Sequence, residues 1–290
     1  MNRVDVINAV LAVLAIGGSL AAVGIGEGEN AAPGTTPTAA TTRYQRIASA
    51  STVADPLLRD LCPADRLVAV SALTREGPQG HRYAAQAAIP SLEALEQIIG
   101  LSPEVLVVSN VGDARRVARL REAGIEVVDL GPPTGLASLK EDMLTLGELC
   151  GRRAAAEEMA ATFEARLERV ASDGTRPRAL YVTVYGGRYY GGTRGSSYHD
   201  VLRYAGLEDA AAGRFLGFPQ YTVEQLLALD PAFLITKTGM GTALCADEAL
   251  ARLKACRNDD VVEVDGAYLD DPGLGMLTAA ERVAAATQPP

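Results

Sequence analysis

Two stretches of the chain share one pattern: SLEALEQIIGLSPEVLVVSN at residues 91–110 and YTVEQLLALDPAFLITKTG at residues 221–239. Each contains a hydroxyl residue, an aliphatic residue and a glutamate, then a leucine-rich run with helical spacing and, after a proline, an apolar strand. A Ser or Thr cap followed by an acid in the first turn stabilises any helix N-terminus. Because the combination occurs twice, at the same step of a helix–strand unit, we predict two similar halves.

The residues around both copies alternate between short β-rich runs and helical segments of about ten residues, the pattern of βα units with parallel strands. In the first half the predicted strands are residues 46–51, 66–72, 104–110 and 125–130. In the second half they are residues 178–186, 232–238 and 261–266. The sequence therefore predicts an α/β fold with two parallel-sheet lobes.

One long helix is predicted between the halves. Residues 152–172 are rich in Ala, Glu and Arg, and their apolar positions follow one helical stripe: Met159, Phe163, Leu167 and Val170. About 20 residues of helix extend roughly 30 Å. We therefore expect an N-terminal lobe over residues 44–150, a backbone helix over 151–172 and a C-terminal lobe over 173–290.

The N-terminal residues differ from the rest in composition. Residues 6–26 are 21 consecutive positions without a charge, long enough to span a bilayer. Residues 27–43 are polar and rich in Pro and Thr, as in a disordered linker. Residues 1–26 are therefore a signal peptide that is removed or a membrane anchor that is retained. Both alternatives predict a periplasmic protein, the second one anchored to the inner membrane by residues 6–26.

The charge distribution excludes some classes of partner. The 290-residue chain has a formal net charge of −9 and no basic run longer than two residues. Nucleic acids and anionic lipid surfaces attract clustered Lys and Arg. We therefore expect no nucleic-acid partner. We also expect a monomer.

Motifs for catalysis or for a resident metal are also missing from the sequence. There is no phosphate-binding G-x-x-x-x-G-K-[ST] loop, and GGRYYGG at residues 186–192 lacks the spacing of a dinucleotide fingerprint. Ser197, His199 and Asp200 are too close along one helix start to converge as a catalytic triad. Two histidines in the whole chain are too few for a receptor of bare zinc or manganese. We expect no enzyme activity, no cofactor and no metal site.

The four cysteines contain no C-x-x-C pair, which excludes a zinc ribbon or a redox motif. In an exported protein they can form disulfides, with three possible connectivities. We favour pairing within each half, Cys62 with Cys150 and Cys245 with Cys256, because each half should fold alone. Four free thiols remain the alternative.

The order of these segments resembles a known family. The segments that carry the resemblance include RIASASTVADPLLRDL, SLEALEQIIGLSPEVLVVSN, LREAGIEVVDLGPPTGLASLKEDMLTLGELCGR, RPRALYVTVYGG, GSSYHDVLRYAGLEDAA, PQYTVEQLLALDPAFLIT and ACRNDDVVEVDG. Together, over residues 46–283, they resemble the substrate-binding proteins of ABC importers for cobalamin, haem and iron-siderophores. The resemblance implies a ligand cleft between the lobes, little hinge closure, and one glutamate on each lobe that docks into the permease. By position, these glutamates are Glu93 and Glu224.

Candidate ligand contacts lie where parallel strands end, because ligands gather at the carboxyl ends of such strands. In the first half these residues are Thr52, Arg75 and Asn110, with His81 and Tyr83 in the loop at 74–90. In the second half the loop at 185–199 supplies Arg188, Tyr189, Tyr190 and Arg194, and segments 236–242 and 266–273 complete the rim. Tyrosines offer flat apolar faces, and arginines bind carboxylates or phosphates.

The remaining tyrosines of the second half are interpreted as structural. Tyr181 and Tyr185 alternate along a predicted strand and are expected in the core. Tyr198 and Tyr204 have helical spacing and are expected to pack. The chain has no Trp, unlike several cobalamin and siderophore receptors of the family that it resembles.

The expected function is capture of a metal chelate, haem or a ferric siderophore, and its delivery to an ABC importer permease and ATPase complex. Two alternatives stay open at this point. One is a cobalamin or corrinoid receptor of the same family. The other is a membrane-tethered sensor module that binds a chelate without transport.

Overall fold

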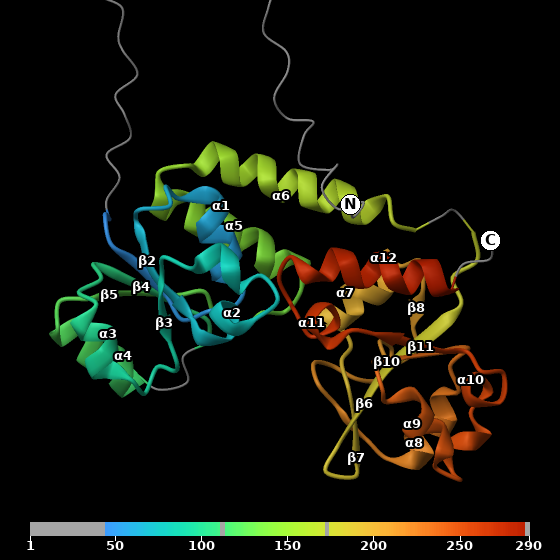
Figure 1. Cartoon of the computed structure of the whole chain (residues 1–290). Helices are drawn as coiled ribbons and strands as arrows, with labels where there is room; N and C mark the ends of the chain where they lie inside the picture. The colour runs from blue at the N-terminus through green and yellow to red at the C-terminus, as the bar shows by residue number, and fades with distance from the viewer. Residues whose placement is uncertain (1–43, 111–113, 172–173, 288–290) are drawn as a thin grey trace, which may run out of the picture. The chain divides into compact units, whose positions relative to one another are not determined.

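The computed structural model describes residues 44–110, 114–171 and 174–287 (Figure 1). The first sheet has five strands, all paired in parallel, in the order β3-β2-β1-β4-β5. Its strands are β1 (Ile47–Ser49), β2 (Leu67–Ser71), β3 (Ala87–Ile89), β4 (Val105–Val108) and β5 (Glu126–Asp129). The strand order reverses between β1 and β4, so the carboxyl ends of these two strands form the switch point at which α/β sheets bind ligands.

Short helices connect the strands of the first sheet. They are α1 (Ala54–Leu61), α2 (Ala72–Glu76), the 3-10 helix η2 (Gly80–Tyr83), α3 (Leu95–Gly100) and α4 (Ala114–Glu122). Buried aliphatic residues of the strands face these helices, for example Leu106 of β4 and Ile98 of α3 in one apolar cluster. The first half is therefore the predicted parallel α/β unit.

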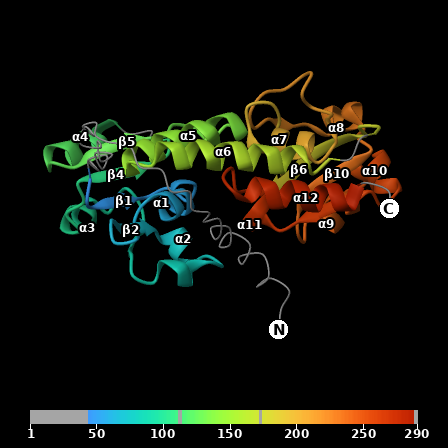
Figure 2. The ribbon, with the colours of Figure 1, turned by 90° about the horizontal axis from the view of Figure 1, so that it is seen from above.

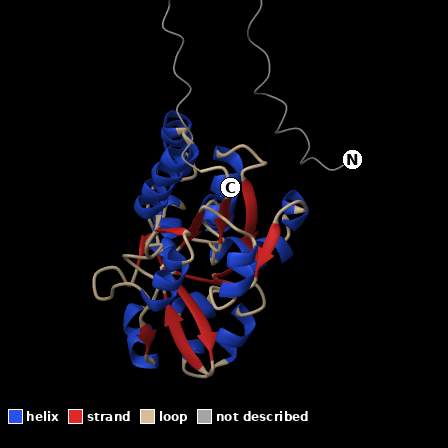
Figure 3. Ribbon diagram, turned by 90° about the vertical axis from the view of Figure 1, so that its left-hand side faces the viewer, coloured by secondary structure: helices blue, strands red, loops and turns tan. Residues whose placement is uncertain are grey.

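The second sheet has the order β11-β10-β6-β7-β9, and β8 pairs with β6. Its strands are β6 (Arg178–Tyr185), β7 (Arg188–Gly191), β8 (Glu208–Asp209), β9 (Gln220–Tyr221), β10 (Phe233–Lys237) and β11 (Val261–Val264). Its helices are α7 (Ser197–Tyr204), α8 (Val223–Leu229), α9 (Gly241–Ala246), η3 (Leu250–Arg252), α10 (Lys254–Arg257), α11 (Gly266–Leu269) and α12 (Gly275–Thr287). Figure 3 shows the strands of both sheets in red between blue helices.

The second sheet is mixed, which corrects the prediction of a parallel sheet. β8, β10 and β11 follow the parallel pattern, but β7 is antiparallel to β6 and β9 is antiparallel to β7. Gly186 and Gly187, with φ of 57° and 71°, form the two-residue turn between β6 and β7. Positive φ at both turn residues matches the twist of a β-hairpin, and glycine adopts it without strain. The residues predicted as an open loop therefore begin with a hairpin.

Two helices lie between β5 and β6. α5 (Leu136–Cys150) ends at Gly151, whose φ of 70° is the left-handed cap of a helix C-terminus, and α6 (Arg153–Glu168) returns along it (Figure 2). A side chain at Gly147 would overlap the Ala156 methyl group, so the two helices are in close contact. α6 has 16 residues and ends at Glu168, earlier than the predicted helix.

A buried arginine fixes the end of α5 against the first sheet. Arg66 donates hydrogen bonds from Nε to the Tyr44 carbonyl at 2.6 Å and from Nη1 to the Cys150 carbonyl at 3.1 Å. Helix C-termini leave their last carbonyls without partners inside the helix, and a cation satisfies them well. The predicted disulfide of Cys62 with Cys150 joins the same helix end to α1. The second predicted disulfide, Cys245 with Cys256, is also present.

The start of α5 is fixed by a residue from the second sheet's helices. Asp200 of α7 accepts a hydrogen bond from the Leu136 amide at 2.6 Å. Gly135 precedes that amide with φ 127° and ψ −156°, a conformation that is nearly restricted to glycine. A Cβ at this position would overlap the Asp200 carboxylate. The helix therefore receives its N-terminal cap from a distant part of the chain.

No helix within residues 44–110, 114–171 and 174–287 is both long and apolar enough to cross a membrane. The predicted signal peptide or anchor at residues 1–26 and the linker at 27–43 lie outside the described residues.

We predict that Asp200→Ala lowers the free energy of unfolding by about 1–2 kcal/mol, the usual effect of losing a helix N-cap. Asp200→Asn keeps an acceptor oxygen and should recover most of this loss. Gly135→Ala should cost at least as much as Asp200→Ala, because it adds backbone strain to the lost cap. Urea unfolding midpoints check all three variants. An Asp200→Ala midpoint equal to that of the wild type would show that this cap does not stabilise the fold.

Candidate functional site

The switch point of the first sheet holds two of the predicted ligand residues. The hydroxyl groups of Ser51 and Ser109, which follow β1 and β4, lie 2.7 Å apart. Next to them, Thr52 and Asn110 are exposed, and the Asn110 amide donates to Asp129 Oδ1 at 2.9 Å. The fold therefore brings Thr52 and Asn110 to one edge, as the sequence predicted from their positions after strands.

The other predicted residues of the first half have different surroundings. Arg75 is half-buried and donates to the carbonyls of Tyr83 and Gln86, the latter at 2.7 Å, so it fixes the loop between β2 and β3. Tyr83 is only 3% exposed and packs in the core, and burial raises its pKa to about 12. His81 is exposed. Of these three side chains, His81 is the one that is available to a ligand.

A buried carboxylate lies beneath the same edge. Asp55 is fully buried, and its Oδ2 accepts a hydrogen bond from the Ser71 amide at 3.0 Å, at the junction of β2 with α2. Its Oδ1 has no hydrogen-bond partner in the part of the chain that the structure describes. Burial raises the pKa of Asp55 to about 6, because the charged form is poorly solvated there. The next helix, α2, carries Leu73, which is 72% exposed.

The β6–β7 hairpin has two different faces. Its register pairs Tyr189 with Val184 and Tyr190 with Thr183, so the two neighbouring tyrosines point to opposite faces. Tyr189 packs against the apolar cluster of α8 and α9, and its hydroxyl donates to Asp247 Oδ2 at 2.7 Å. Burial, followed by the bond to Asp247, raises the pKa of Tyr189 to about 12. Tyr189 therefore supports the hairpin from its core face.

The opposite face of the hairpin is open to solvent. Tyr185 is 80% exposed, which corrects its predicted place in the core, and it pairs across the strands with the exposed Arg188. Tyr190 is half-buried on the same face. Strand alternation placed Tyr181 and Tyr185 together, but β6 extends beyond its neighbour β10, so only Tyr181 is covered. We call Tyr185, Arg188 and Tyr190 the hairpin surface.

Tyr198 connects the hairpin sheet to the predicted rim segments. Its ring stacks on Tyr181 with centroids 3.8 Å apart and 9° between the planes, and its hydroxyl donates to Asp270 at 2.8 Å. Lys237 Nζ donates to the other oxygen of Asp270 at 3.0 Å. Segments 236–242 and 266–273 are thus joined by an ion pair. Tyr198 packs as predicted, and burial raises its pKa well above the usual range.

Exposed apolar residues that the sequence reasoning missed lie beside Arg194. Leu216 is 72% exposed and Phe218 is 65% exposed, and Phe218 meets the Tyr198 ring edge-on at 6.2 Å. Arg194 is exposed as well. The sequence held a signal for Leu216 and Phe218. Both lie in GRFLGFPQ at residues 213–220, a Gly- and Pro-containing segment without helical or strand periodicity. Exposed apolar groups of this kind mark interaction sites.

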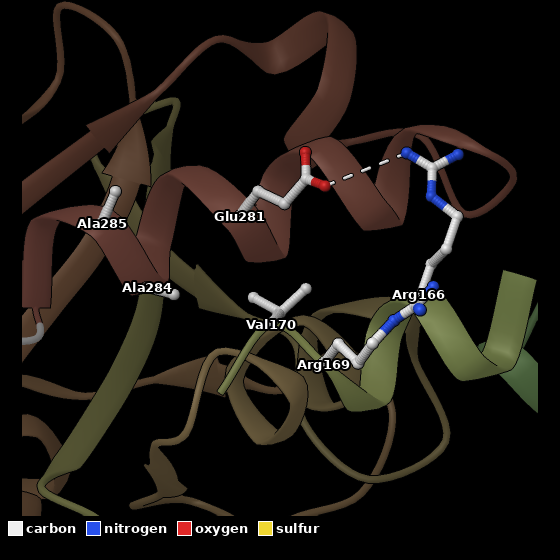
Figure 4. Close-up of a pocket in the computed structure, with 6 residues that line it drawn as sticks. All are labelled: Arg166, Arg169, Val170, Glu281, Ala284 and Ala285. Atoms are coloured by element: carbon white, nitrogen blue, oxygen red, sulfur yellow. Dashed lines mark ion pairs between the residues drawn. The ribbon is translucent and has the colours of Figure 1, made fainter. Parts of the chain in front are cut away.

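Two surface grooves lie elsewhere. The first, of about 470 Å³, lies between the end of α6 and α12; Figure 4 shows Arg166 extended toward Glu281 across its mouth and Val170 below Glu281. The 4.0 Å separation of this pair is typical of a weak surface ion pair. The second groove, of about 450 Å³, is lined by α5, α6 and α7. Neither groove contains a predicted ligand residue.

The two predicted docking glutamates have different local structures. Glu224 lies in the first turn of α8, where Thr222 and Gln225 form a reciprocal capping box. Hydrogen bonds from its own backbone N–H and from Thr222 lower the pKa of Glu224.

Glu93 instead lies in a turn two residues before α3, with its amide donating to Ser91 Oγ at 3.2 Å. Its carboxylate pairs with Arg116 of α4 at 3.1 Å. The repeated sequence pattern therefore forms a capped helix only in its second copy, although both glutamates are exposed.

Comparison with known proteins places this arrangement in a family. Residues 47–268 match the family described as periplasmic binding protein. The chain belongs to the periplasmic binding protein family. It is a substrate-binding protein of the ABC-importer type, and not an enzyme.

The individual proteins that the chain resembles have low sequence identity to it. A curated cobalamin-binding protein of Halobacterium salinarum is 26% identical over 255 residues, covering 83% of this chain and 68% of the relative. The periplasmic heme-binding protein HutB of Vibrio cholerae has a TM-score of 0.74 at 20% identity, with 84% of this chain and 99% of that chain covered. The vitamin B12-binding protein BtuF of the same species has a TM-score of 0.66 at 22% identity, with 84% and 96% covered. At these identities the structures show a shared fold.

We predict that Asp55 makes the stability of this binding protein depend on pH. Between its ordinary pKa of 3.8 and about 6, the folded state holds a proton that the unfolded state has lost, so stability falls as pH rises through this window. Asp55→Asn keeps the acceptor for Ser71 and cannot ionise. From pH 4 to pH 7, its free energy of unfolding should rise by about 2.5 kcal/mol relative to the wild type.

Urea unfolding at several pH values measures this difference. Asp60→Asn, a change at a more exposed carboxyl of the same helix, is the control and should show a smaller trend. A difference between Asp55→Asn and the wild type that stays constant with pH would contradict the prediction.

Proposed function

We propose that the protein captures a metal chelate, haem or a ferric siderophore, in the periplasm and delivers it to an ABC importer permease. The observation that carries this proposal is the hairpin surface. An 80% exposed tyrosine on one face with an arginine and a second tyrosine is well suited to a partly apolar ligand.

The chemistry of the hairpin surface favours a planar, anionic cargo. Tyr185 and Tyr190 offer aromatic faces that stack on a flat macrocycle or on catecholate rings. Arg188, and Arg194 nearby in the chain, provide guanidinium groups for carboxylates. From the first sheet we include Thr52, Asn110 and His81, because their side chains are exposed. Tyr189 supports the hairpin from its core face, and Arg75 and Tyr83 hold the loop between β2 and β3; none of the three makes a direct contact in the proposal.

A corrinoid is the second candidate cargo, and the comparison with curated relatives favours it. The relative from Halobacterium salinarum is named a cobalamin-binding protein. A corrin ring is also large and flat, but cobalamin carries mainly amide side groups. It would therefore depend less on Arg188 and Arg194 than haem does.

For delivery we propose that Glu93 and Glu224 dock into basic pockets of the permease. Both carboxylates are exposed, and each lies near the start of a helix that follows an edge strand, β3 or β9, of its sheet. Residues 6–26 would either be removed or tether the protein near its transporter. We propose that the protein acts as a monomer.

Titration of the purified protein with haem, cyanocobalamin and a ferric siderophore, followed by absorbance, tests the cargo. We expect saturable binding of an iron chelate. Tyr185→Ser and Arg188→Ser should each weaken it about tenfold, the loss typical of a central contact residue. Arg178→Ser is the matched control at the other end of β6 and should bind normally. Binding of cyanocobalamin alone would select the corrinoid alternative, and no binding at all would reject the chelate proposal.

Cargo uptake by cells, or by proteoliposomes containing the transporter, tests delivery. Glu93→Ala with Glu224→Ala should abolish uptake while leaving the cargo dissociation constant unchanged, because neither residue belongs to the hairpin surface. Glu96→Ala with Glu248→Ala removes exposed acids of the same two halves and serves as the control. Uptake that survives the first pair would contradict docking through these glutamates and favour a tethered binding module without transport.

A further inference from the structure

We propose that two basic clusters, one beside each of Glu93 and Glu224, belong to the permease-binding surface and meet acidic groups on the permease. The first cluster is Arg115, Arg116, Arg119 and Arg121 of α4, and the second is Arg252 of η3 with Lys254 and Arg257 of α10. We call these two sets the basic clusters. The inference rests on the proposed function, since it adds contacts to the same partner.

The basic clusters concentrate positive charge in an acidic chain. Four of the nine residues of α4 are arginines, and three of the six residues at 252–257 are basic. The whole chain has a formal net charge of −9 and no basic run longer than two residues. Apolar residues separate the basic ones in the sequence, so each cluster forms only when helical turns bring its members together.

Both basic clusters occupy the same step of their halves. In the first half α3 is followed by β4 and α4, and in the second half α8 is followed by β10 and then by α9, η3 and α10. α4 packs against α3, and η3 packs against α8. Figure 1 shows α3 beside α4 in one half, and α8 with α9 and α10 in the other. The unit that carries each glutamate therefore also carries a basic helix next to it.

Direct contacts join each basic cluster to its glutamate segment. Arg116 Nη2 donates to Glu93 Oε1 at 3.1 Å. In the second half Asp230, at the end of α8, accepts from the Lys254 amide at 2.8 Å. α8 has seven residues, so about 10 Å separates this junction from the turn that holds Glu224. A typical protein interface buries about 800 Å² on each partner, so one that covers a glutamate also reaches its basic cluster.

Most of the basic side chains are available to a partner. Five of them are exposed and form no ion pair with any acidic residue that the structure describes: Arg119, Arg121, Arg252, Lys254 and Arg257. Exposed cations create a local positive potential even on an acidic protein. Charges at the rim of an interface steer association and make it depend on salt. The basic clusters therefore suit a role in the encounter with the permease.

The mixture of charges on these elements favours a protein partner over a lipid bilayer. Glu96 on α3, Glu122 at the end of α4 and Glu248 before η3 are exposed acids among the basic residues. An anionic bilayer would repel these acids and the chain's net negative charge. A protein can present acids opposite the arginines and basic pockets opposite the glutamates, and such alternation fixes orientation and rejects other partners. The partner surface is therefore a permease face with acidic groups beside each basic pocket.

Cargo uptake by cells of the source organism, with the gene replaced by each variant, tests the proposal. The probe is whichever of haem, cyanocobalamin and a ferric siderophore the purified wild type binds. Arg119→Gln, Arg121→Gln, Arg252→Gln and Lys254→Gln together should lower the initial uptake rate about tenfold, because electrostatic steering is lost. The two changes of either half alone should lower it about threefold. Added salt should narrow the difference from the wild type, because it screens exposed charges.

A charge-matched control removes four exposed arginines outside the basic clusters: Arg152, Arg169, Arg176 and Arg178, each changed to Gln. This variant should take up the probe at the wild-type rate. Both fourfold variants should keep the cargo dissociation constant, because neither set belongs to the hairpin surface. An equal fall in uptake for the two variants would reveal a general effect of charge and overturn the proposal.

Vesicles without protein test the lipid alternative. Purified full-length protein is mixed with phosphatidylcholine vesicles, with and without phosphatidylglycerol. We expect the anionic lipid to add no binding that depends on the basic clusters. Binding to phosphatidylglycerol that the fourfold cluster variant loses would show that the clusters face lipid, and would overturn the contact with the permease.

The outcomes distinguish this inference from the proposed function. Wild-type cells that take up none of the three probes reject delivery itself. Uptake that is lost with Glu93→Ala and Glu224→Ala but kept in the fourfold cluster variant overturns the basic clusters alone. Uptake that falls in the cluster variant but survives loss of both glutamates supports the clusters as the permease contact and rejects docking through the glutamates.

Discussion

The hydrogen bond from the Leu136 amide to Asp200 is the constraint on which the rest of the arrangement depends. It caps α5 with a carboxylate from α7, so the helix that leaves the first sheet begins against the second. At its other end the helix is held by Arg66 and the disulfide of Cys62 with Cys150. The helix is thus held at both ends by groups from different parts of the chain and packs along α6.

Elements of the fold position the exposed candidate residues of both halves. The first sheet presents Thr52 and Asn110 at its switch point, where the geometry of parallel strands gathers loop residues. In the second sheet, the residues that were predicted as an open loop begin with the β6–β7 hairpin. The backbone pairing of a hairpin holds its side chains in register without help from a ligand. On the other face of the hairpin, the half-buried Tyr189 bonds to Asp247 and packs against the apolar cluster of α8 and α9.

Much of the fold could be predicted from the sequence, because strand and helix periodicity is a local property. The alternation of elements and the two halves follow from such local signals, whereas the two disulfide pairs were favoured because each half was expected to fold alone. Periodicity does not predict the hairpin, because RYYG at residues 188–191 is too short to show alternation. The prediction that Tyr185 lies in the core was wrong for another reason. Alternation shows which face of a strand a residue occupies, but not where the neighbouring strand ends.

The sequence by itself determined which residues alternate, which cysteines could pair and which family the segments resemble, since these depend on order along the chain. Only the tertiary structure decided which candidates reach solvent. Tyr189 and Tyr190 are adjacent in sequence yet lie on opposite faces, and Glu93 meets Arg116 only because α3 and α4 pack together. Exposure and pairing depend on what other elements cover, and that is a property of packing between distant segments.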